Sequence, residues 1–306
     1  MRAINEKEAL AAASGRWCVE LLCTFQDATF IYVAMEFVQG GDLFSHIDKK
    51  GRFSLAETAF YMAELLESVD TLHQCGFIHR DLKPDNIVLS ASGHLKLLDF
   101  GLCTHSSQSD HELACRLANC TVEAVSGRKA LRSICGTPHY MAPEMFEGTC
   151  SPAADIWAIG VITYECLTGS LPFFSQETGK SAWKAIKQQV LNHEEFLIPR
   201  LSRLRAKQLS MGASESSCEA AEIFMAKVLC GRSRRLTAAH CRREQFFRDI
   251  DFPRLAEMKP PITIKVSGPS DASQFDKFPQ EHLPDPERLD LCDPTFEWLH
   301  YEVDGQ

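Results

Sequence analysis

The sequence contains no apolar run long enough to cross a lipid bilayer, which takes about 20 residues. The longest run, Ile156 to Leu167, is too short and includes Glu165. Residues 1–10 are charged and polar, so an apolar secretory leader is not expected either. An integral membrane protein and a secreted protein are therefore excluded from the expected classes.

Positive charge is also scarce. The 306 residues include 32 Lys and Arg against 41 Asp and Glu, which gives a formal net charge of −9. A nucleic-acid binder is disfavoured, because binding to the phosphate backbone relies on clustered Lys and Arg. An acidic surface suits basic protein partners; the alternative is that the charge serves only solubility.

The cysteines show no C-x2-C pair followed by a second such pair, and their number, 13, is odd. Scattered positions such as Cys18, Cys75, Cys166 and Cys230 are typical of small buried hydrophobes in a reducing compartment. The apolar share of 45% lies in the ordinary globular range. We expect a soluble protein of the cytoplasm, with the nucleus as a second location.

The apolar pattern predicts a small strand-bearing piece followed by a large helical body. Residues 4–13 favour a helix, and Val19–Phe25 and Phe30–Met35 are typical of two antiparallel strands joined by a turn. A helical period with apolar residues on one face begins at Ser54, and Gly76 supplies a stop. The predicted fold class is α+β.

Residues 153–169 are apolar nearly all round, which predicts a helix buried in the body. Polar loops are expected over 104–132 and 206–217, and the chain after residue 250 holds most of the prolines with little periodicity. The chain thus divides into a small piece, a helical body and an extended tail. The predicted boundaries are 1–38, 39–247 and 248–306.

Three motifs follow one another in the sequence. His79-Arg80-Asp81-Leu82-Lys83-Pro84-Asp85-Asn86 fits H-R-D-L-x-x-x-N, and Asp99-Phe100-Gly101 and Ala142-Pro143-Glu144 come after it. Each short motif is weak alone, since D-F-G occurs by chance in many chains. All three in this order, with the first matched over its whole length, are typical of a protein kinase.

Phosphoryl transfer to a hydroxyl group requires positioning of the reactants and cancellation of negative charge. In that reaction Asp81 would orient the substrate hydroxyl and accept its proton, and Lys83 would neutralise charge developing on the γ-phosphate. Asn86 and Asp99 supply hard oxygen ligands of the kind that Mg²⁺ prefers. The expected cofactors are therefore ATP and Mg²⁺.

Other charged residues are expected to support the body of the protein. Asp155, near the start of the buried helix, is expected to accept hydrogen bonds from the backbone of the catalytic loop. Glu144 and Arg235 are candidates for a buried ion pair, although without a family resemblance the alternative, a solvated Arg235 within Arg232–Arg235, is favoured. The basic run Arg200–Lys207 is interpreted only as a solvated face.

The details resemble the AGC group of protein kinases, and within it the NDR/LATS (Warts-like) branch. Asp99-Phe100-Gly101-Leu102-Cys103-Thr104 matches the magnesium loop of that branch, and the activation segment, 99–144, has a long insert. The AGC tail is matched at Ile250–Phe252 and Asp271–Asp276, and the terminal hydrophobic motif at Phe296–Tyr301. The resemblance runs from residue 1 to about residue 301 and implies a serine/threonine kinase.

This resemblance implies a site for ATP. Residues 1–38 would be the remnant of the small lobe, with helix αC and the last two strands of the family's sheet. Glu6 matches the αC glutamate that pairs with the ATP-binding lysine. Met35 would be the gatekeeper, and Glu36 to Val38 the hinge that offers backbone groups to adenine.

Regulatory and substrate residues follow from the same resemblance. Ser133 matches the phosphosite of the activation segment, where an upstream kinase would add a phosphate that could pair with Arg80. Thr137 matches the residue that favours Ser or Thr acceptors over Tyr. Asp42 and Asp85 occupy positions that receive basic side chains, so protein substrates with basic residues near the acceptor are expected.

The chain departs from the family pattern at its start. It contains no G-x-G-x-x-G loop and no V-A-I-K lysine, so three of the five small-lobe strands would be absent and Glu6 would have no lysine to bind. The remaining strand pair is expected to form a marginal hairpin with an unpaired edge. We therefore expect residues 1–306 to bind ATP weakly.

Two further departures concern regulation. His300 stands where the family carries a phosphorylatable Ser or Thr, and the insert over 105–132 has few basic residues. The region that binds the branch's MOB-type co-activator is expected to be lost together with the missing N-terminal part. Two interpretations stay open: an N-terminally truncated kinase, or a catalytically impaired binding module that sequesters partners.

Overall fold

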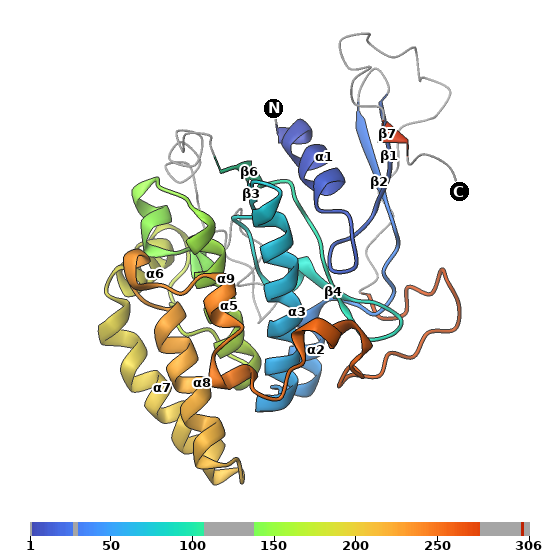
Figure 1. Ribbon diagram of the computed structural model, residues 1–306. Coiled ribbons are helices and arrows are strands. Elements are labelled where there is room, and N and C mark those ends of the chain that lie inside the picture. The colour runs from blue at the N-terminus through green and yellow to red at the C-terminus, as the bar shows by residue number, and fades with distance from the viewer. Residues whose placement is uncertain (1, 27–29, 107–137, 276–300, 303–306) are drawn as a thin grey trace.

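The computed structural model of this protein describes residues 2–26, 30–106, 138–275 and 301–302. Its small piece contains helix α1 (Arg2–Ala12) and the strands β1 (Leu21–Gln26) and β2 (Ile31–Met35). The two strands are antiparallel, with Thr24 opposite Val33. The predicted helix and strand pair are confirmed, and they lie together above the helical body (Figure 1).

A third strand corrects the expectation of an isolated hairpin. β7 (Tyr301–Glu302) pairs antiparallel with β1, so the order of the sheet is β2-β1-β7. The unpaired backbone groups at the edge of β1 therefore find a partner from the far end of the chain. Within the described residues, β2 and β7 are the two edge strands of this sheet.

The large body is mainly helical, with α3 and α5 packed against each other and α8 against α5. Its α-helices are α2 (Leu43–Lys50), α3 (Leu55–Gln74), α5 (Pro152–Thr168), α6 (Gly179–Leu191), α7 (His193–Ser210), α8 (Glu215–Val228) and α9 (Ala238–Cys241). Short 3₁₀ helices cover Pro84–Asn86, Pro138–Tyr140, Pro143–Glu147, Arg232–Arg234, Gln245–Phe247 and Phe252–Glu257.

The predicted helix from Ser54 to Gly76 is confirmed as α3, and its ends show why it forms there. The Ser54 hydroxyl accepts a hydrogen bond from the Glu57 N–H (3.2 Å), and the Glu57 carboxylate accepts one from the Ser54 N–H (2.8 Å). This reciprocal capping satisfies two N–H groups that the helix leaves free. Gly76 has a φ of 84°, which favours glycine and ends the helix.

The predicted all-round apolar helix is confirmed as α5, which is buried from Ala154 to Leu167. Gly160 lets α5 approach the end of α8 closely, because an added Cβ would lie 2.6 Å from Val228 Cγ2. Four short strands join the body near the catalytic loop. β3 (Phe77–Ile78) pairs with β6 (Thr104–His105), and β4 (Ile87–Leu89) pairs with β5 (Leu95–Leu97).

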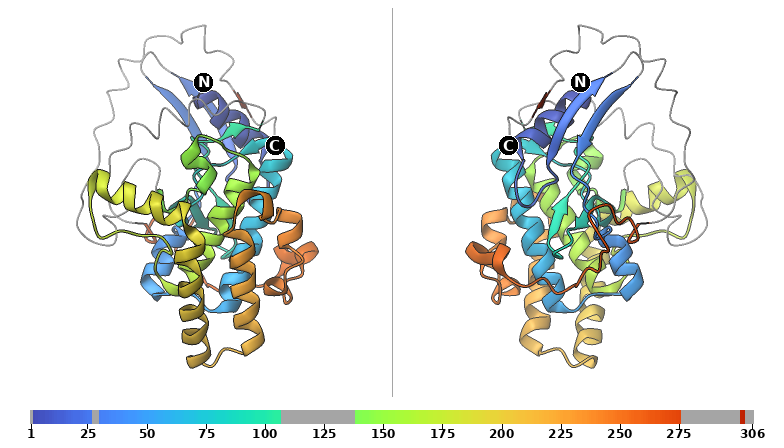
Figure 2. Two further views of the ribbon diagram at one scale, coloured as in Figure 1. Left: turned by 90° about the vertical axis from the view of Figure 1, so that its left-hand side faces the viewer. Right: turned by 90° about the vertical axis from the view of Figure 1, so that its right-hand side faces the viewer.

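The predicted loop over 206–217 is wrong, because most of that range is helical. α7 continues to Ser210 and α8 begins at Glu215. Leu204 and Gln208 are buried on the side of α7 that faces the body, which stabilises the helix beyond the point where its sequence becomes polar. The views in Figure 2 place α7 and α8 side by side, at the end of the body away from β1 and β2.

The basic run Arg200–Lys207 lies within α7 and is not wholly solvated. Arg205 forms ion pairs with Glu215 and with Glu222, the latter at 3.1 Å, so it ties α7 to α8. Arg203 and Lys207 are exposed on the outer face, as expected.

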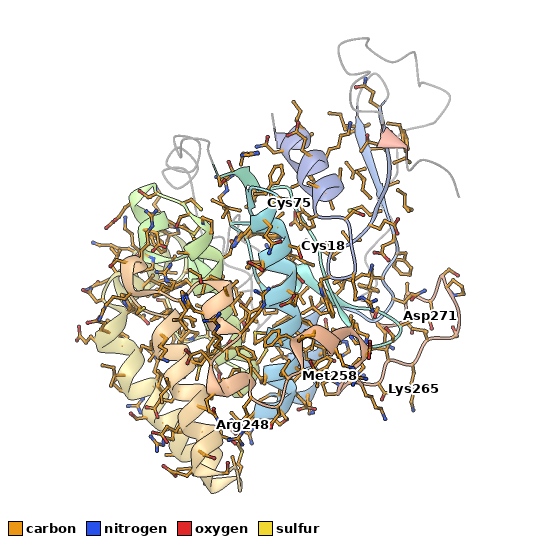
Figure 3. The ribbon with its side chains drawn as sticks, viewed as in Figure 1. Cys18, Cys75, Arg248, Met258, Lys265 and Asp271 are labelled. Carbon is orange, nitrogen blue, oxygen red and sulfur yellow. The ribbon has the colours of Figure 1, made fainter. Side chains whose placement is uncertain are left out.

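The tail returns along the body to the small piece (Figure 3). Met258 packs against the core, and the chain then passes Lys265 and Asp271. Near its described end, Gln39 donates a hydrogen bond to the Pro269 carbonyl (2.6 Å), and the rings of Phe37 and Phe275 lie 5.8 Å apart. The tail thus contacts the segment that connects the two lobes.

The described cysteines are all free thiols. Cys18 and Cys166 are buried, whereas Cys75 and Cys230 are only half-buried. Burial raises the pKa of the Cys18 thiol to about 12, which suits a structural role rather than a reactive one. Among the residues that the structure describes, no helix combines the length and the apolar character needed to span a membrane.

Candidate active site

The segment from His79 to Asn86 places three polar side chains together. Lys83 Nζ lies 2.6 Å from Asp81 Oδ2, and Asn86 Nδ2 donates to the Asp81 carbonyl (2.9 Å) and to Oδ2 (3.2 Å). Within the described residues, Asp81 Oδ1 takes no hydrogen bond. One carboxylate oxygen is therefore fixed by two donors, and the other has no donor among the described residues.

Asp155 holds the backbone of this loop, as predicted. Its two carboxylate oxygens accept hydrogen bonds from the N–H groups of His79 and Arg80, both at 2.9 Å, and His73 Nε2 lies 2.7 Å from Oδ2. Burial alone would raise the pKa of Asp155, but the hydrogen bond from His73 and the surrounding donors lower it overall. A charged, buried carboxylate therefore stabilises the strained φ of 67° at Arg80.

Asp99 lies beside this loop because β4 and β5 form a hairpin. Ile87 pairs with Leu97, so Asn86 and Asp99 flank the same end of the hairpin. The Leu98 N–H donates to the Asn86 carbonyl (2.8 Å), and Phe100 is buried with its ring 5.5 Å from His79. Asp99 itself is exposed.

The oxygens of Asn86 and Asp99 fit a magnesium ion. Because the Asn86 amide nitrogen is bound to Asp81, the amide oxygen is the atom left for a cation. Among the described residues, Asp99 Oδ1 accepts a hydrogen bond only from the Gly101 N–H, at 3.2 Å. Within the described residues, no three His, Cys, Asp or Glu side chains gather into a metal site, so phosphate oxygens or waters would complete the coordination.

Glu6 reaches the same region from α1. A Cβ placed on Gly101 would lie 3.6 Å from Glu6 Oε2 and 3.2 Å from Asp99 Oδ1, so both carboxylates approach Gly101. Burial and the charge of Asp99 raise the pKa of Glu6. No cation lies within ion-pair distance of Glu6 among the described residues, which leaves its negative charge uncompensated.

Replacing Glu6 with Gln is therefore expected to stabilise the protein at pH 7. A carboxyl group whose pKa is raised by folding stabilises the protein below its unfolded pKa and loses that contribution as pH rises. The melting temperature of Glu6→Gln should thus exceed that of the wild type at pH 7, and the difference should shrink toward pH 4.5. Differential scanning calorimetry checks this, with Glu8→Gln, an exposed position on the same helix, as the control.

The residues expected at the adenine site lie at the end of β2. Met35 is exposed and Val38 is buried. The Glu36 carboxylate accepts the Glu20 N–H (2.8 Å) and pairs with Lys96, while the Glu36 N–H donates to the Glu20 carbonyl (3.0 Å). The side chain of Glu36 is therefore structural, and its backbone carbonyl is the group that could serve adenine.

The remaining predicted residues are placed less centrally. Asp42 caps α2 by accepting the Ser45 N–H (2.7 Å), and Asp85 is half-buried in the 3₁₀ turn before β4. Arg80 Nε donates to the Leu102 carbonyl (2.7 Å). Ser133 and Thr137 lie outside the described residues.

Sequence reasoning missed two partners of the site. His73 ends α3 and contacts Asp155, and Lys96 comes from β5 to bind Glu36. Neither belongs to a motif used in the prediction. The His94–Glu64 contact (2.5 Å) that joins β5 to α3 was missed in the same way.

Comparisons with known proteins agree with this geometry. A protein kinase domain profile matches residues 1–247. The chain is 35% identical over 305 residues to serine/threonine-protein kinase tricornered of Drosophila pseudoobscura pseudoobscura, covering 91% of this chain and 62% of that protein. It is 33% identical over 317 residues to serine/threonine-protein kinase Warts of Drosophila melanogaster, covering 95% of this chain and 27% of that protein.

A further relative is the probable serine/threonine-protein kinase ndrB of Dictyostelium discoideum, 31% identical over 295 residues, with 89% of this chain and 53% of that protein covered. The chain thus spans less than two thirds of the length of these relatives. The profile match covers both the catalytic loop and the helices that hold it. The chain therefore belongs to the protein kinase family, in which it resembles the NDR/LATS branch.

Proposed function

We propose that the protein transfers the γ-phosphate of ATP to serine or threonine hydroxyls of protein substrates. The observation that carries this proposal is the hydrogen bonding of the Asp81 carboxylate. One of its carboxylate oxygens is held by Lys83 and Asn86, and the other takes no hydrogen bond among the described residues. Such a carboxylate can orient a hydroxyl group and accept its proton.

The other residues have supporting roles in the proposed reaction. Lys83, 2.6 Å from Asp81, supplies positive charge beside the transferred group. Asn86 and Asp99 would hold magnesium, which when bound with ATP cancels charge on the phosphates. Asp155 keeps the loop backbone in place, so that the Asp81 carboxylate needs no rearrangement when a substrate arrives.

Substrate choice and regulation are part of the same proposal. Asp42 and Asp85 would receive basic side chains of the substrate, and the Asp42 carboxylate also caps α2. Ser133 would be phosphorylated by an upstream kinase and pair with Arg80, and Thr137 would favour Ser and Thr acceptors.

A second function, a binding module without catalysis, is favoured by one observation. Glu6 approaches Asp99 without a compensating cation in the described part of the chain, and two uncompensated carboxylates repel a nucleotide's phosphates. The two functions differ in whether Mg·ATP binds at all.

Binding of Mg·ATP separates the two functions. The kinase proposal predicts that roughly millimolar Mg·ATP raises the melting temperature of the 306-residue chain, because a ligand that binds only the folded state stabilises it. Asp99→Ala should remove this rise, while Asp251→Ala, an exposed position in the tail, should keep it. EDTA should abolish the rise in the wild type. A melting temperature that does not change when Mg·ATP is added would favour the binding module.

A further inference from the structure

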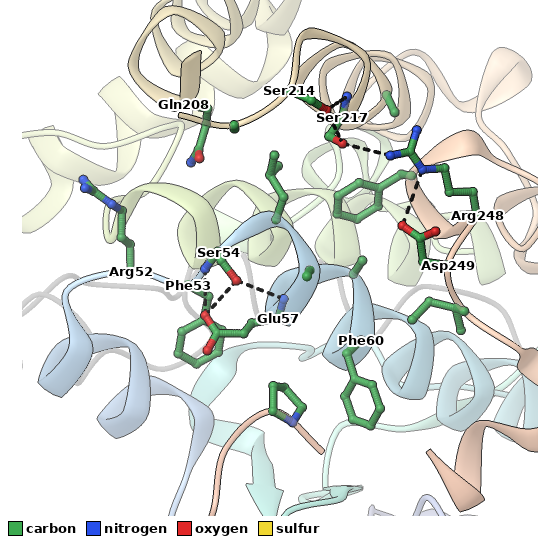
Figure 4. Close-up of a pocket in the computed structure, with 18 of the residues that line it drawn as sticks. Arg52, Phe53, Ser54, Glu57, Phe60, Gln208, Ser214, Ser217, Arg248 and Asp249 are labelled. Carbon is green, nitrogen blue, oxygen red and sulfur yellow. Dashed lines mark hydrogen bonds and ion pairs between the residues drawn. The ribbon is translucent and has the colours of Figure 1, made fainter. Parts of the chain in front are cut away.

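A cavity of about 790 Å³ lies at the end of the helical body away from the catalytic loop. α3 begins at this cavity and ends at Gln74, shortly before His79, and a 20-residue helix spans about 30 Å. The walls come from the first turn of α3, the turn between α7 and α8, and residues 245–261 (Figure 4). We call this the basal cavity; the proposed phosphoryl transfer does not use it.

The floor of the basal cavity is apolar. Its bulky lining residues are Phe53, Leu55, Phe60, Phe246, Ile250 and Met258. Phe53, Phe60 and Phe246 are buried in the body, and the other three are half-buried. A concave apolar site of this volume suits one or two large apolar side chains of a ligand together with their flanking chain.

The rim of the basal cavity carries an excess of positive charge. Four cationic side chains line it, Lys50, Arg52, Arg248 and Lys259, against two carboxylates, those of Glu57 and Asp249. Both carboxylates are already engaged: Glu57 pairs with Lys50, and Asp249 lies 3.4 Å from Arg248. This local excess of positive charge contrasts with the whole chain, which is acidic and has a net charge of −9.

Two of these cations have no carboxylate partner among the described residues. Arg52 donates only to the thioether sulfur of Met211 (2.6 Å), which is a weak acceptor. Lys259 is exposed and forms no ion pair within the described residues. The donors of Arg52 and Lys259 are therefore open to a ligand, and a guanidinium binds carboxylates strongly when both oxygens are offered.

We propose that the basal cavity docks an acidic peptide segment of a partner protein, with a large apolar side chain inserted on the floor. The cations come from two walls of the cavity, residues 50–52 and residues 248–259, and Figure 4 shows Arg52 and Arg248 on opposite sides of the cavity. A ligand with a single anionic head would reach only one side. A peptide with acidic residues on both sides of an apolar anchor matches both the floor and the rim.

Selection from a random peptide library tests this proposal. A phage-displayed library of 12-residue peptides would be selected on the 306-residue chain, after depletion on the double variant Arg52→Glu/Lys259→Glu. We expect selected peptides with Asp or Glu on both sides of Leu, Phe or Trp. In fluorescence anisotropy the double variant should weaken their binding about tenfold or more, and added salt should weaken it further.

Two variants make the test specific. Ala56→Trp, at the mouth of the cavity, should block binding without removing a charge. Arg203→Glu/Lys207→Glu reverses two exposed cations of α7 outside the cavity and should leave binding unchanged. The proposal is overturned if no peptide is enriched over the depleting variant, if the selected peptides lack acidic residues, or if the Ala56→Trp variant binds them as well as the wild type. The selection needs no phosphoryl transfer, so its result is independent of the proposed kinase function.

Discussion

Replacing Arg235 with alanine is expected to lower the free energy of unfolding by about 3–5 kcal/mol, because it leaves the buried carboxylate of Glu144 without its counter-charge. The Arg235 side chain is fully buried and forms two contacts with Glu144, at 2.5 and 3.1 Å. It also donates to the carbonyls of Ala153 and Cys230, and its guanidinium lies 5.1 Å from the ring of Trp157.

Urea unfolding measures this loss, and the neighbouring residue provides the control. Arg234 pairs with Glu194 on the surface, where both side chains are about two-thirds exposed, so Arg234→Ala should cost less than about 0.5 kcal/mol. The double variant Arg235→Met/Glu144→Gln should recover part of the lost stability, since it removes both charges. Equal losses for Arg234→Ala and Arg235→Ala would contradict the buried ion pair.

Replacing Asp81 with asparagine is expected to lower kcat by about 10²–10⁴-fold, because the amide retains the shape of the side chain but cannot accept the hydroxyl proton. The KM for a peptide substrate should change little, since the substrate contacts proposed for Asp42 and Asp85 remain. Steady-state kinetics with a serine peptide measures both constants.

The stability of the Asp81→Asn variant separates a chemical effect from a folding effect. Asp81 is half-buried, and the backbone of its loop is held by a hydrogen bond to Asp155 that the substitution does not touch. The melting temperature should therefore stay close to that of the wild type. Asp251→Asn, an exposed change in the tail, should leave kcat unchanged. A fall in kcat that follows a fall in melting temperature would remove the support for Asp81 as the base.

Local patterns were enough to predict the elements that hold the catalytic loop. The apolar period and the caps of α3 are encoded within the helix itself, and α5 is apolar on all sides. The hydrogen bonds of Asp155 were expected from its place near the start of the buried helix, and the ion pair between Glu144 and Arg235 was favoured only through the family resemblance; the structure confirms both. For Arg235 the alternative of a solvated charge is wrong.

Features that depend on distant segments were not predicted. β7 pairs with β1, although most of the chain lies between the two strands in the sequence. Neither a hydrophobic period nor a turn sequence predicts such a pairing. The end of α7 has a polar sequence, yet packing of Leu204 and Gln208 keeps it helical. The contacts of His73 and Lys96 were not predicted for a similar reason, because the sequence around a lone histidine or lysine does not identify its distant partner.

The central claim, that residues 79–99 form a phosphoryl-transfer site, is tested most directly by transfer of labelled γ-phosphate from Mg·ATP to a peptide. The 306-residue chain would be incubated with a peptide that carries arginines before a serine, and the labelled amino acid would be identified. The account predicts phosphoserine with the wild type and none with Asp81→Asn. No label with the wild type at saturating Mg·ATP, or equal labelling by the two proteins, would contradict it.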